Sequence, residues 1–385
     1  MTNLLEFLEN VINVNDENTP IDVFYLDFKK AFDKVPHARL ILKLQALGLD
    51  ENLIRWIRVW LQGRTQRVVV NGACSEWSSV LSGVPQGSVL GPVLFLIYIN
   101  DLDEGIKSKI LKFADDAKMM GNTGSDLEAR VVQDDLDKLT AWAEKWQMEY
   151  NVNKCKVMHF GNKNGKRRFS LGLNELTETK EERDLGIIIC DDLKVHKQCI
   201  KAANKGNQVL GLISRTFSSK KRSIVMKLYK SLVRPHLDYC SQAWNPHYIN
   251  DIETIEKVQR RATRMIEECK NLKYEDRLRR TRLTTLETRR IRADLLEVFK
   301  IVHGLDNIRE DLFFTRSNSK SYYTTRGHSF KFFKKRFNTD TAKYSFGNRV
   351  VDTWNNLPEE IVQSESFLTF KIRLDHYIGS TLGLL

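Results

Sequence analysis

Three aspartates constrain the fold of this chain more than any other feature. Asp27 ends an apolar segment, residues 21–27, and the adjacent Asp115 and Asp116 separate two further short apolar segments. β-Branched and aromatic residues predict strands there, with Asp115-Asp116 at a hairpin turn. Carboxylates gathered near a core repel one another unless hard cations neutralise them. The pattern indicates a sheet that collects acids around divalent ions. A plain polar turn is the alternative, because Asp is common in turns.

The remaining pattern predicts an α+β first half and an all-α second half. Asn71-Gly72 between two apolar runs predicts a second hairpin. The predicted helices of the first half cover residues 3–14, 36–47, 51–61, 89–100 and 125–147, and those of the second half cover residues 195–217, 223–232, 252–268 and 289–302.

Charge is distributed unevenly along the chain. Residues 1–160 hold 18 Lys and Arg against 22 Asp and Glu, whereas residues 161–385 hold 43 against 27. Residues 257–292 alone contain 13 basic and five acidic side chains. Within them, Arg260, Arg261 and Arg264 form a basic stripe beside an apolar helical stripe. The asymmetry predicts that the second half holds a polyanion, and a solvated basic surface is the alternative.

Several classes of protein are not expected. The most apolar stretch, residues 89–99, is too short to span a bilayer, and the N-terminus lacks the basic start of a secretory leader. Six cysteines without a CxxC pair predict an intracellular, reducing location. Cys240, His247 and Cys269 lack the spacing of a zinc site. The other cysteines are expected to pack as small apolar residues; they are Cys74, Cys155, Cys190 and Cys199.

Four ordered motifs support a more specific interpretation: residues 24–33 (FYLDFKKAFD), 82–88 (SGVPQGS), 113–116 (FADD) and 151–158 (NVNKCKVM). Residues 183–187, 228–236 and 257–262 add RDLGI, LYKSLVRPH and KVQRRA. In this order the chain resembles reverse transcriptases of non-LTR, LINE-type retrotransposons, of the chicken-repeat and jockey-like groups. FADD replaces the more widespread Tyr-x-Asp-Asp and keeps both acids.

The resemblance implies the fold of a right-hand polymerase: a palm, with an antiparallel sheet backed by helices, then an all-α thumb and a basic C-terminal helical region. The implied divisions are a remnant of the fingers (1–20), the palm (21–160), a primer-grip region (161–190), the thumb (191–270) and a basic extension (271–385).

The resemblance also implies a two-metal site. Asp27 and Asp115 match its metal ligands, and Asp116 matches an occasional ligand or a support for the turn. Two Mg²⁺ ions, replaceable by Mn²⁺, would serve transfer of dNTPs onto the 3′-hydroxyl of a DNA primer along an RNA template.

Four further residues match positions around the incoming nucleotide. The carbonyl of Phe28 would lie beside the metal ligand Asp27. Phe32 would lie beneath the sugar, where a bulky ring excludes a 2′-hydroxyl; an ordinary core phenylalanine is the alternative. Gln86 and Gly87 would lie over the nucleotide and template, since glycine permits close backbone approach.

Two more positions concern the leaving group and the primer. Lys154 matches a lysine near the departing pyrophosphate, as a general acid or charge stabiliser, and Lys156 is the alternative two residues on. Asp184, Leu185 and Gly186 match the turn that supports the primer terminus through backbone geometry. The arginine stripe of residues 260–264 would contact phosphates without reading sequence.

The chain also departs from the family pattern, because little sequence precedes residue 24 and neither an endonuclease nor a ribonuclease H pattern is evident. We therefore expect nucleic-acid binding with little polymerisation, in the cytoplasm or nucleus, with the oligomeric state open. One alternative function is that of a non-catalytic nucleic-acid-binding remnant of a mobile element. Another is an RNA-directed RNA polymerase or intron maturase, and Phe32 argues against the RNA polymerase.

Overall fold

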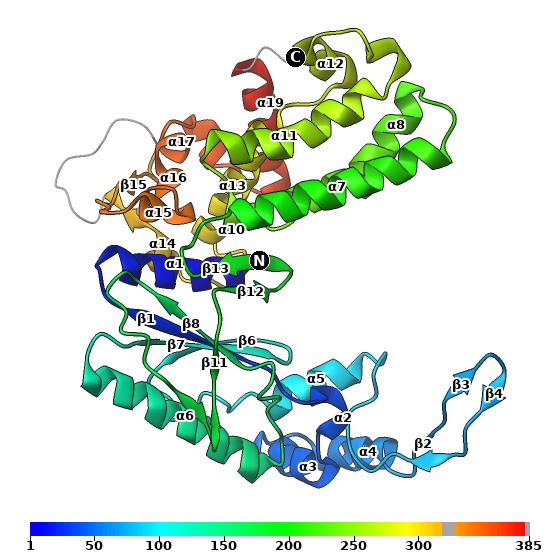
Figure 1. Cartoon of the computed structure of the whole chain (residues 1–385), viewed down its shortest axis with the longest axis vertical. Helices are drawn as coiled ribbons and strands as arrows, with labels where there is room; N and C mark the ends of the chain where they lie inside the picture. The colour runs from blue at the N-terminus through cyan, green and yellow to red at the C-terminus, as the bar shows by residue number, and fades with distance from the viewer. Residues whose placement is uncertain (318–327, 382–385) are drawn as a thin grey trace. The chain divides into compact units, whose positions relative to one another are not determined.

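The computed structural model describes residues 1–317 and 328–381. Two compact units make up the chain: one is Asn18–Lys180, and the other combines Met1–Glu17 with Glu181–Leu385. The first unit is built on a central sheet, and the second is mostly helical (Figure 1). The expected α+β class, with strands early and helices late, is confirmed.

A five-stranded sheet forms the centre of the Asn18–Lys180 unit. In sheet order its strands are β11 (Thr177–Glu178), β8 (Lys156–Phe160), β1 (Ile21–Leu26), β7 (Asp116–Asn122) and β6 (Lys109–Phe113). β1 lies in the middle and is antiparallel to both β7 and β8, while β11 is parallel to β8. β-Branched and aromatic residues fill β1, as a buried central strand requires.

Helices pack against one face of this sheet. Because strand side chains alternate between faces, Phe24, Leu26 and Phe28 fall on the same side, and all three are buried in one apolar core with the helices. Asp27, between Leu26 and Phe28, falls on the opposite side. The helices are α2 (Ala31–Lys34), α3 (His37–Ala46), α4 (Glu51–Leu61), α5 (Leu90–Tyr98) and α6 (Asp126–Trp146), and α6 runs along the sheet (Figure 1).

A long hairpin leaves this unit between α4 and α5. It consists of β2 (Thr65–Gln66) paired with β5 (Ser78–Ser79), and β3 (Val69–Val70) paired with β4 (Ala73–Cys74). Asn71 and Gly72 have φ values of 50° and 86°, the left-handed conformation of a two-residue hairpin turn. All residues from 62 to 79 are exposed. A further small pair joins β9 (Ser170–Leu171) to β10 (Asn174–Glu175).

The second unit begins its C-terminal part with a hairpin and continues as helices. The two long helices α7 and α11 pack side by side (Figure 1). The elements are β12 (Glu181–Asp184), β13 (Ile187–Cys190), α7 (His196–Thr216), α8 (Arg222–Leu228), a π-helical turn (Tyr229–Val233), α9 (Arg234–Asp238), α10 (Ser241–Trp244), α11 (Ile249–Arg264), a 3₁₀ turn (Glu267–Cys269), α12 (Tyr274–Thr281), α13 (Leu286–Val302), α14 (Glu310–Phe313), β14 (Thr315–Arg316), β15 (Phe332–Phe333), α15 (Asp340–Lys343), α16 (Phe346–Arg349), α17 (Val351–Asn355), α18 (Glu359–Val362) and α19 (Phe367–Thr381).

Gln259 of α11 joins several of these helices. Its side chain is fully buried; the amide nitrogen donates to Tyr274 Oη at 3.0 Å and to the Thr284 carbonyl at 2.9 Å. Its oxygen accepts a hydrogen bond from Tyr229 Oη at 2.8 Å. A buried amide satisfied on both sides adds rigidity without an unpaired polar group. The KVQRRA segment therefore has a structural reason for glutamine at this position.

The N-terminal helix α1 (Thr2–Asp16) belongs to the same unit as residues 181–385. Asp16 Oδ1 accepts hydrogen bonds from the Thr339 backbone N–H and hydroxyl, each at 2.7 Å, and from the Asn338 N–H at 3.0 Å. Glu9 is buried and accepts from the Gly347 N–H at 3.3 Å. Residues 1–20 as a remnant of the fingers stays a prediction, but α1 folds with the C-terminal region.

The other expected divisions relate to these units as follows. The sheet unit extends beyond residue 160 to Lys180, because Thr177 and Glu178 pair with β8. The region expected at 161–190 is therefore divided between the two units. Residues 191–270 and 271–385 lie in one unit, since α13 packs on both α11 and α19. The names palm, primer grip and thumb remain predictions for these segments.

Buried Glu9 makes the stability of the helical unit depend on pH. Burial raises the pKa of Glu9 to about 7, although Lys335 and Arg349 oppose the shift. Between pH 4.5 and 7 the unfolded chain loses this proton while the folded chain keeps it, so the free energy of unfolding falls as pH rises. We expect Glu9→Gln to remove up to about 3 kcal/mol of this decline, as measured by urea unfolding at a series of pH values.

Glu17→Gln is the matched control, because Glu17 is exposed just after α1. It should leave the pH profile of the wild type unchanged. Parallel profiles for wild type and Glu9→Gln would contradict the assignment.

Candidate active site

Asp27 is held at the end of the central strand by backbone contacts. Its carbonyl accepts a hydrogen bond from the Asn151 N–H at 2.8 Å, and its own N–H donates to Cys155 Sγ at 3.4 Å. Phe28 then pairs with Tyr150 in a short antiparallel bridge. The segments 24–33 and 151–158, predicted as separate motifs, therefore lie side by side. Their contacts fix the backbone position from which the Asp27 side chain extends.

Asp115 and Asp116 occupy the hairpin between β6 and β7. Phe113 pairs with Asp116, so Ala114 and Asp115 form a two-residue turn, with Ala114 in the left-handed region at φ 52°. Leu26 pairs with Ala117 across β1 and β7, so the next step of this register brings Asp27 beside Asp116. Asp115 is half-buried and Asp116 is exposed. The expected hairpin is confirmed, but only Asp115 lies in its turn, because Asp116 already begins β7.

The carboxylates fit a hard divalent cation that shares its ligands with substrate. Asp27 Oδ2 is shielded from solvent and accepts no hydrogen bond from the described residues. Within residues 1–317 and 328–381, no three His, Cys, Asp or Glu side chains are gathered closely enough to hold a metal ion. Mg²⁺ suits such a site, since it is usually bound through one or two carboxylates plus water and substrate phosphates.

Lys154, rather than Lys156, approaches the first aspartate. Lys154 Nζ lies 3.3 Å from Asp27 Oδ2, and its side chain is 66% exposed. Lys156 is within β8, directly opposite Tyr25 of β1. A mobile ammonium beside a strand-end carboxylate can follow a ligand, whereas a strand residue has a fixed direction. The geometry therefore favours Lys154 for the lysine of this motif.

Phe32 and the loop at residues 82–88 are joined by a set of short hydrogen bonds. The Val84 N–H donates to the Phe32 carbonyl at 2.8 Å, and Gln86 Nε2 donates to Asp33 Oδ1 at 2.8 Å. The ring of Phe32 is half-buried and lies 4.5 Å from that of Phe95, nearly parallel. Phe28 instead stacks on Tyr150 at 4.6 Å. The three residues predicted to contact the nucleotide, Phe32, Gln86 and Gly87, thus lie on two segments that are joined by hydrogen bonds.

Gly83 is required at this junction. Its φ is 92°, and a Cβ placed on it would lie 2.7 Å from the Asp33 carbonyl oxygen. The Gly83 N–H donates to the Val35 carbonyl at 2.8 Å, and its own carbonyl lies 2.8 Å from His37 Nε2. Only glycine allows the two backbones to approach this closely.

An open cleft of about 720 Å³ adjoins these residues. Its volume falls in the range of about 300–1,000 Å³ that is typical of ligand sites. Three cations line it, Lys30, Lys34 and Arg64, together with Asp33 and Gln86. A polyphosphate would find both positive charge and room there. Lys34 also forms an ion pair with Glu149, whose pKa the hydrogen bonds from Lys34 and Lys29 lower to about 2.

Asp184, Leu185 and Gly186 form a tight turn in the helical unit. Leu185 and Gly186 have φ values of 44° and 90° and connect β12 to β13. Tyr239 Oη donates to the Leu185 carbonyl at 3.0 Å, and Lys201 Nζ donates to the Gly186 carbonyl at 2.8 Å. The turn predicted from RDLGI is therefore present, with its carbonyls tied to two helical segments.

The three arginines of α11 have different surroundings. Arg260 is half-buried; its two terminal nitrogens donate to the Glu253 carboxylate and its guanidinium lies 5.0 Å from the Tyr274 ring. Arg261 and Arg264 are exposed, and Arg261 donates to Asn207 Oδ1 at 3.0 Å. The predicted stripe is thus divided, because Glu253 lies two turns earlier on the face of Arg260.

A family model described as reverse transcriptase (RNA-dependent DNA polymerase) matches residues 6–214, more than half of the chain. The chain belongs to the reverse transcriptase family. This confirms the resemblance inferred from the order of the motifs.

The chain is similar in sequence to curated polymerases of Drosophila mobile elements. The RNA-directed DNA polymerase from mobile element jockey of Drosophila funebris is 28% identical over 256 residues, covering 63% of this chain and 28% of that protein. A probable RNA-directed DNA polymerase from transposon X-element of Drosophila melanogaster is 26% identical over 275 residues, covering 68% and 30%. The chain therefore spans less than a third of either relative.

A solved structure of Candida tropicalis telomerase, in complex with a fragment of telomeric RNA, aligns with 68% of this chain and 42% of the telomerase chain, at a TM-score of 0.38 and 13% identity. Among residues 1–317 and 328–381, no helix is both long and apolar enough to cross a membrane.

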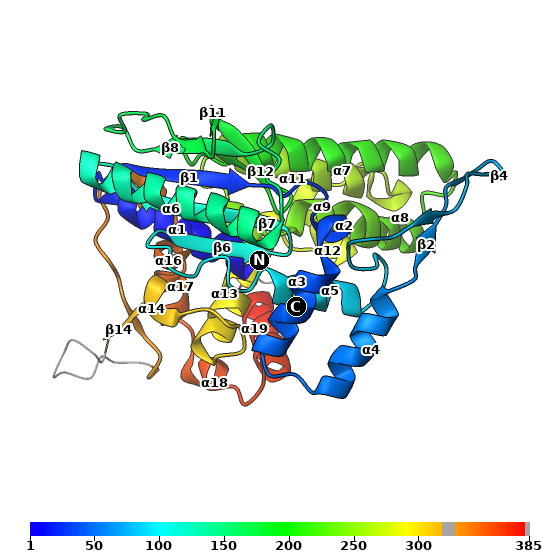
Figure 2. The same cartoon turned by 90° about the horizontal axis from the view of Figure 1, so that it is seen from below.

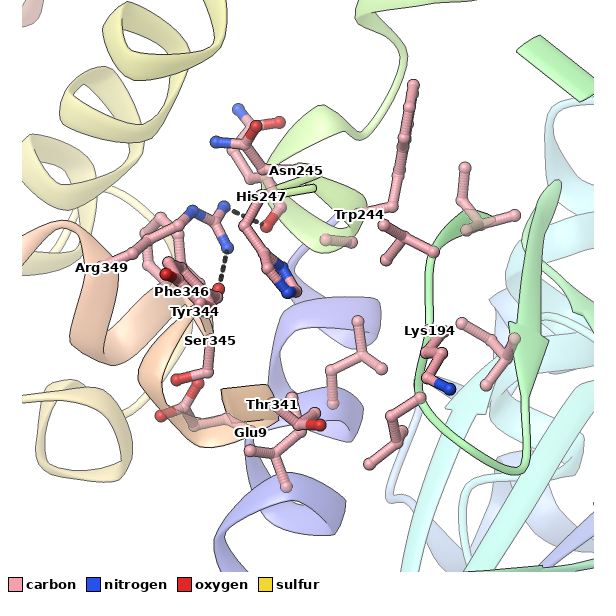
Figure 3. A pocket seen from close by; sticks show the side chains of 18 of the residues that line it. Glu9, Lys194, Trp244, Asn245, His247, Thr341, Tyr344, Ser345, Phe346 and Arg349 are labelled. Atoms are coloured by element: carbon pink, nitrogen blue, oxygen red, sulfur yellow. Dashed lines mark hydrogen bonds between the residues drawn. The ribbon is translucent and has the colours of Figure 1, made fainter. Parts of the chain in front are cut away.

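A second cavity lies within the helical unit (Figure 3). Its volume is about 90 Å³, and α1, β13 and the region around α15 and α16 line it. His247 stacks on Tyr344 with ring centroids 4.0 Å apart. The cavity is far below the about 300 Å³ at the lower end of ligand sites, and it contains none of the predicted catalytic residues. We interpret this cavity as a space left where α1 packs against its neighbours, and not as a ligand site.

The cysteines mostly behave as expected. Burial raises the pKa of Cys155 to about 11 and that of Cys199 to about 12, so neither is a nucleophile near neutral pH. Cys190 is buried as well. The expectation for Cys74 is wrong, because it lies exposed on the hairpin that projects into solvent.

Sequence reasoning missed the charged residues of the cleft. Lys30 lies within the 24–33 motif and immediately precedes the short helix α2, in the left-handed conformation at φ 52°, and Lys34 ends that helix. Arg64 begins the projecting hairpin, and only the fold brings it to the same cleft.

The junction at Gly83 predicts a large difference between two glycines. Gly83→Ala should lower the free energy of unfolding by at least about 2 kcal/mol, since it combines a left-handed backbone with a backbone clash. Gly87 has a φ of 79° with open space around its Cβ, so Gly87→Ala should cost about 1 kcal/mol. Urea unfolding of both variants measures the difference, and equal losses would contradict the close approach.

Proposed function

We propose that this chain is the polymerase part of a non-LTR retrotransposon, an RNA-directed DNA polymerase that adds deoxynucleotides to a primer 3′-hydroxyl. The observation that supports it most is the convergence of three distant motifs. Asp27, the Asp115 turn and Lys154 come from three separate segments of the chain, yet the strands that carry or adjoin them, β1, β7 and β8, are paired in one sheet.

Asp27 and Asp115 would hold Mg²⁺, with Asp116 supporting the turn beside them. When bound, such ions would activate the primer hydroxyl and stabilise charge on the leaving oxygen. Asp27 would present its Oδ2, which only the Lys154 ammonium approaches among the described residues, and the half-buried Asp115 would face the same ligand from the hairpin. The carbonyl of Phe28 would lie next to them.

Lys154 would exchange its partner during the reaction. It lies 3.3 Å from Asp27 Oδ2 and is largely exposed, so it can turn toward a departing pyrophosphate and neutralise charge or donate a proton there. Lys30, Lys34 and Arg64 would attract the triphosphate to the cleft at the same time. Positioning and charge stabilisation supply most of phosphoryl-transfer catalysis, so these cations would matter as much as the ligands.

Phe32 would select the sugar, and Gln86 and Gly87 would border the nucleotide. Gln86 is oriented by its hydrogen bond to Asp33, and the ring of Phe32 is held against Phe95. The primer terminus would rest on the turn formed by Asp184, Leu185 and Gly186.

Duplex phosphates would contact Arg261 and Arg264. Arg260 would support them from its pair with Glu253. RNA template, DNA primer and dNTPs are the partners that this arrangement implies.

The carboxylates provide the first test. With Mg²⁺ or Mn²⁺, the chain should extend oligo(dT) on poly(rA) slowly, and Asp27→Asn or Asp115→Asn should reduce the rate by at least about a hundredfold, since even outer-shell changes at metal sites cost tenfold or more. Asp134→Asn, an exposed aspartate on α6, is the matched control and should keep the wild-type rate. Extension that persists in both variants, or an inert wild type that still binds primer–template, would favour the non-catalytic remnant.

Sugar selection provides a second test. Phe32→Val removes the ring that would contact a 2′-hydroxyl, so the ratio of dNTP to rNTP incorporation should fall by at least about tenfold while dNTP use changes less. Single-nucleotide extension with matched dNTP and rNTP measures this ratio. If the ratio stays the same while stability falls, Phe32 serves only to pack against Phe95.

A further inference from the structure

Two tryptophans are stacked on the outer face of α4. The rings of Trp56 and Trp60 are within 9° of parallel, with centroids 6.1 Å apart, and Trp56 is 55% exposed. The inner face of the same helix is already used, because Ile54 and Ile57 are buried in the core. Trp60 is half-buried against the same core, so the aromatic surface that α4 leaves available for a partner is mainly that of Trp56.

Arginines accompany these rings. The Arg64 guanidinium lies 5.7 Å from the Trp60 ring, and on the hairpin the Arg67 guanidinium lies 4.6 Å from that of Trp77, which is 61% exposed. Residues 52–75 contain four arginines and no acidic residue. Exposed aromatic faces combined with positive charge are the composition of surfaces that bind single-stranded nucleic acid.

This surface continues from the cleft beside the candidate active site. Arg64, Thr65 and Gln66 line that cleft together with Asp33 and Gln86, and they also form the base of the hairpin. Figure 2 shows the hairpin extending from α4 through β2 toward β4, away from the five-stranded sheet. A strand that leaves the cleft on this side would therefore pass along the hairpin.

We propose that Trp56, Trp60, Arg64, Arg67 and Trp77, here called the tryptophan platform, hold the single-stranded part of the template without reading its sequence. Bases would stack on the indoles, and phosphates would contact the arginines. That the strand is a template rests on the proposed function, whereas its binding requires no catalysis. The exposed aromatic surface alone would also suit a protein partner. The excess of arginine favours a polyanion instead.

Binding measured without metal or dNTP tests the platform. Fluorescence anisotropy would follow a labelled oligo(rU) of about 12 nucleotides, a length within the site sizes of such surfaces, and a blunt duplex for comparison. The full chain carrying Trp56→Ala and Trp77→Ala should bind the single strand at least about tenfold more weakly. Its affinity for the duplex should be unchanged, since the arginines of α11 would hold that ligand.

Two controls separate stacking from general apolar contact. Trp56→Phe keeps an aromatic face and should retain affinity within about twofold. Val59→Ala, on the same exposed face of α4, removes apolar surface without a ring and should have no effect. Equal losses in Val59→Ala and Trp56→Ala would instead indicate a face for a protein partner and overturn the proposal. Wild-type affinity in the double tryptophan variant would overturn it too.

Salt dependence gives an independent readout. If Arg64 contacts one phosphate, Arg64→Gln should reduce the slope of log affinity against log salt by about 0.7 for a single strand, and an unchanged slope would remove Arg64 from the platform. Asp115→Asn should bind oligo(rU) as the wild type does. A wild-type chain that binds oligo(rU) but extends no primer would therefore count against the proposed function alone. A wild-type chain that extends a primer, together with wild-type oligo(rU) binding by the double tryptophan variant, would count against the platform alone.

Discussion

The antiparallel pairing of β1 with β7 and β8 is the constraint on which the site depends. The register of these strands fixes the position of Asp27 along the sheet, the position of the Asp115 turn, and the position of the segment that carries Lys154. A slip of one residue in either pairing would turn Asp27 toward the apolar core and Phe28 toward solvent. The packing of Phe24 and Leu26 in the apolar core opposes that slip.

A second level of order comes from backbone contacts outside the sheet. The loop at residues 82–88 is joined to the segment after Asp27 through Gly83, Val84 and Gln86. Main-chain hydrogen bonds hold the loop through Gly83 and Val84 and do not depend on the identity of most neighbouring side chains, whereas Gln86 is oriented by the Asp33 side chain. Strand pairing and these loop contacts together explain how the end of β1, the loop and the cleft can act together although each is built from a different stretch of sequence.

Local sequence patterns predicted the elements well and their partners poorly. The helix predicted at 51–61 is α4, that at 195–217 is α7 shortened by one residue at each end, and Asn71-Gly72 does form a hairpin turn. The docking of α1 could not be predicted, because Asp16 and Glu9 meet residues more than 300 positions away. Neither could the pair of Arg260 with Glu253, since helical periodicity alone does not say which charged side chains will meet.

Because α1 packs against residues near 338–349, the helical unit is discontinuous in sequence. The sheet unit, in contrast, is one uninterrupted segment. During synthesis the sheet unit can fold as soon as residues up to 180 have emerged, since domains generally fold as units in the order of their production. The first helix must wait, with its apolar face uncovered, until almost the entire chain has left the ribosome. A ribosome that stops early would thus release a folded sheet unit bearing an exposed helix, a form suited to capture by chaperones or proteases.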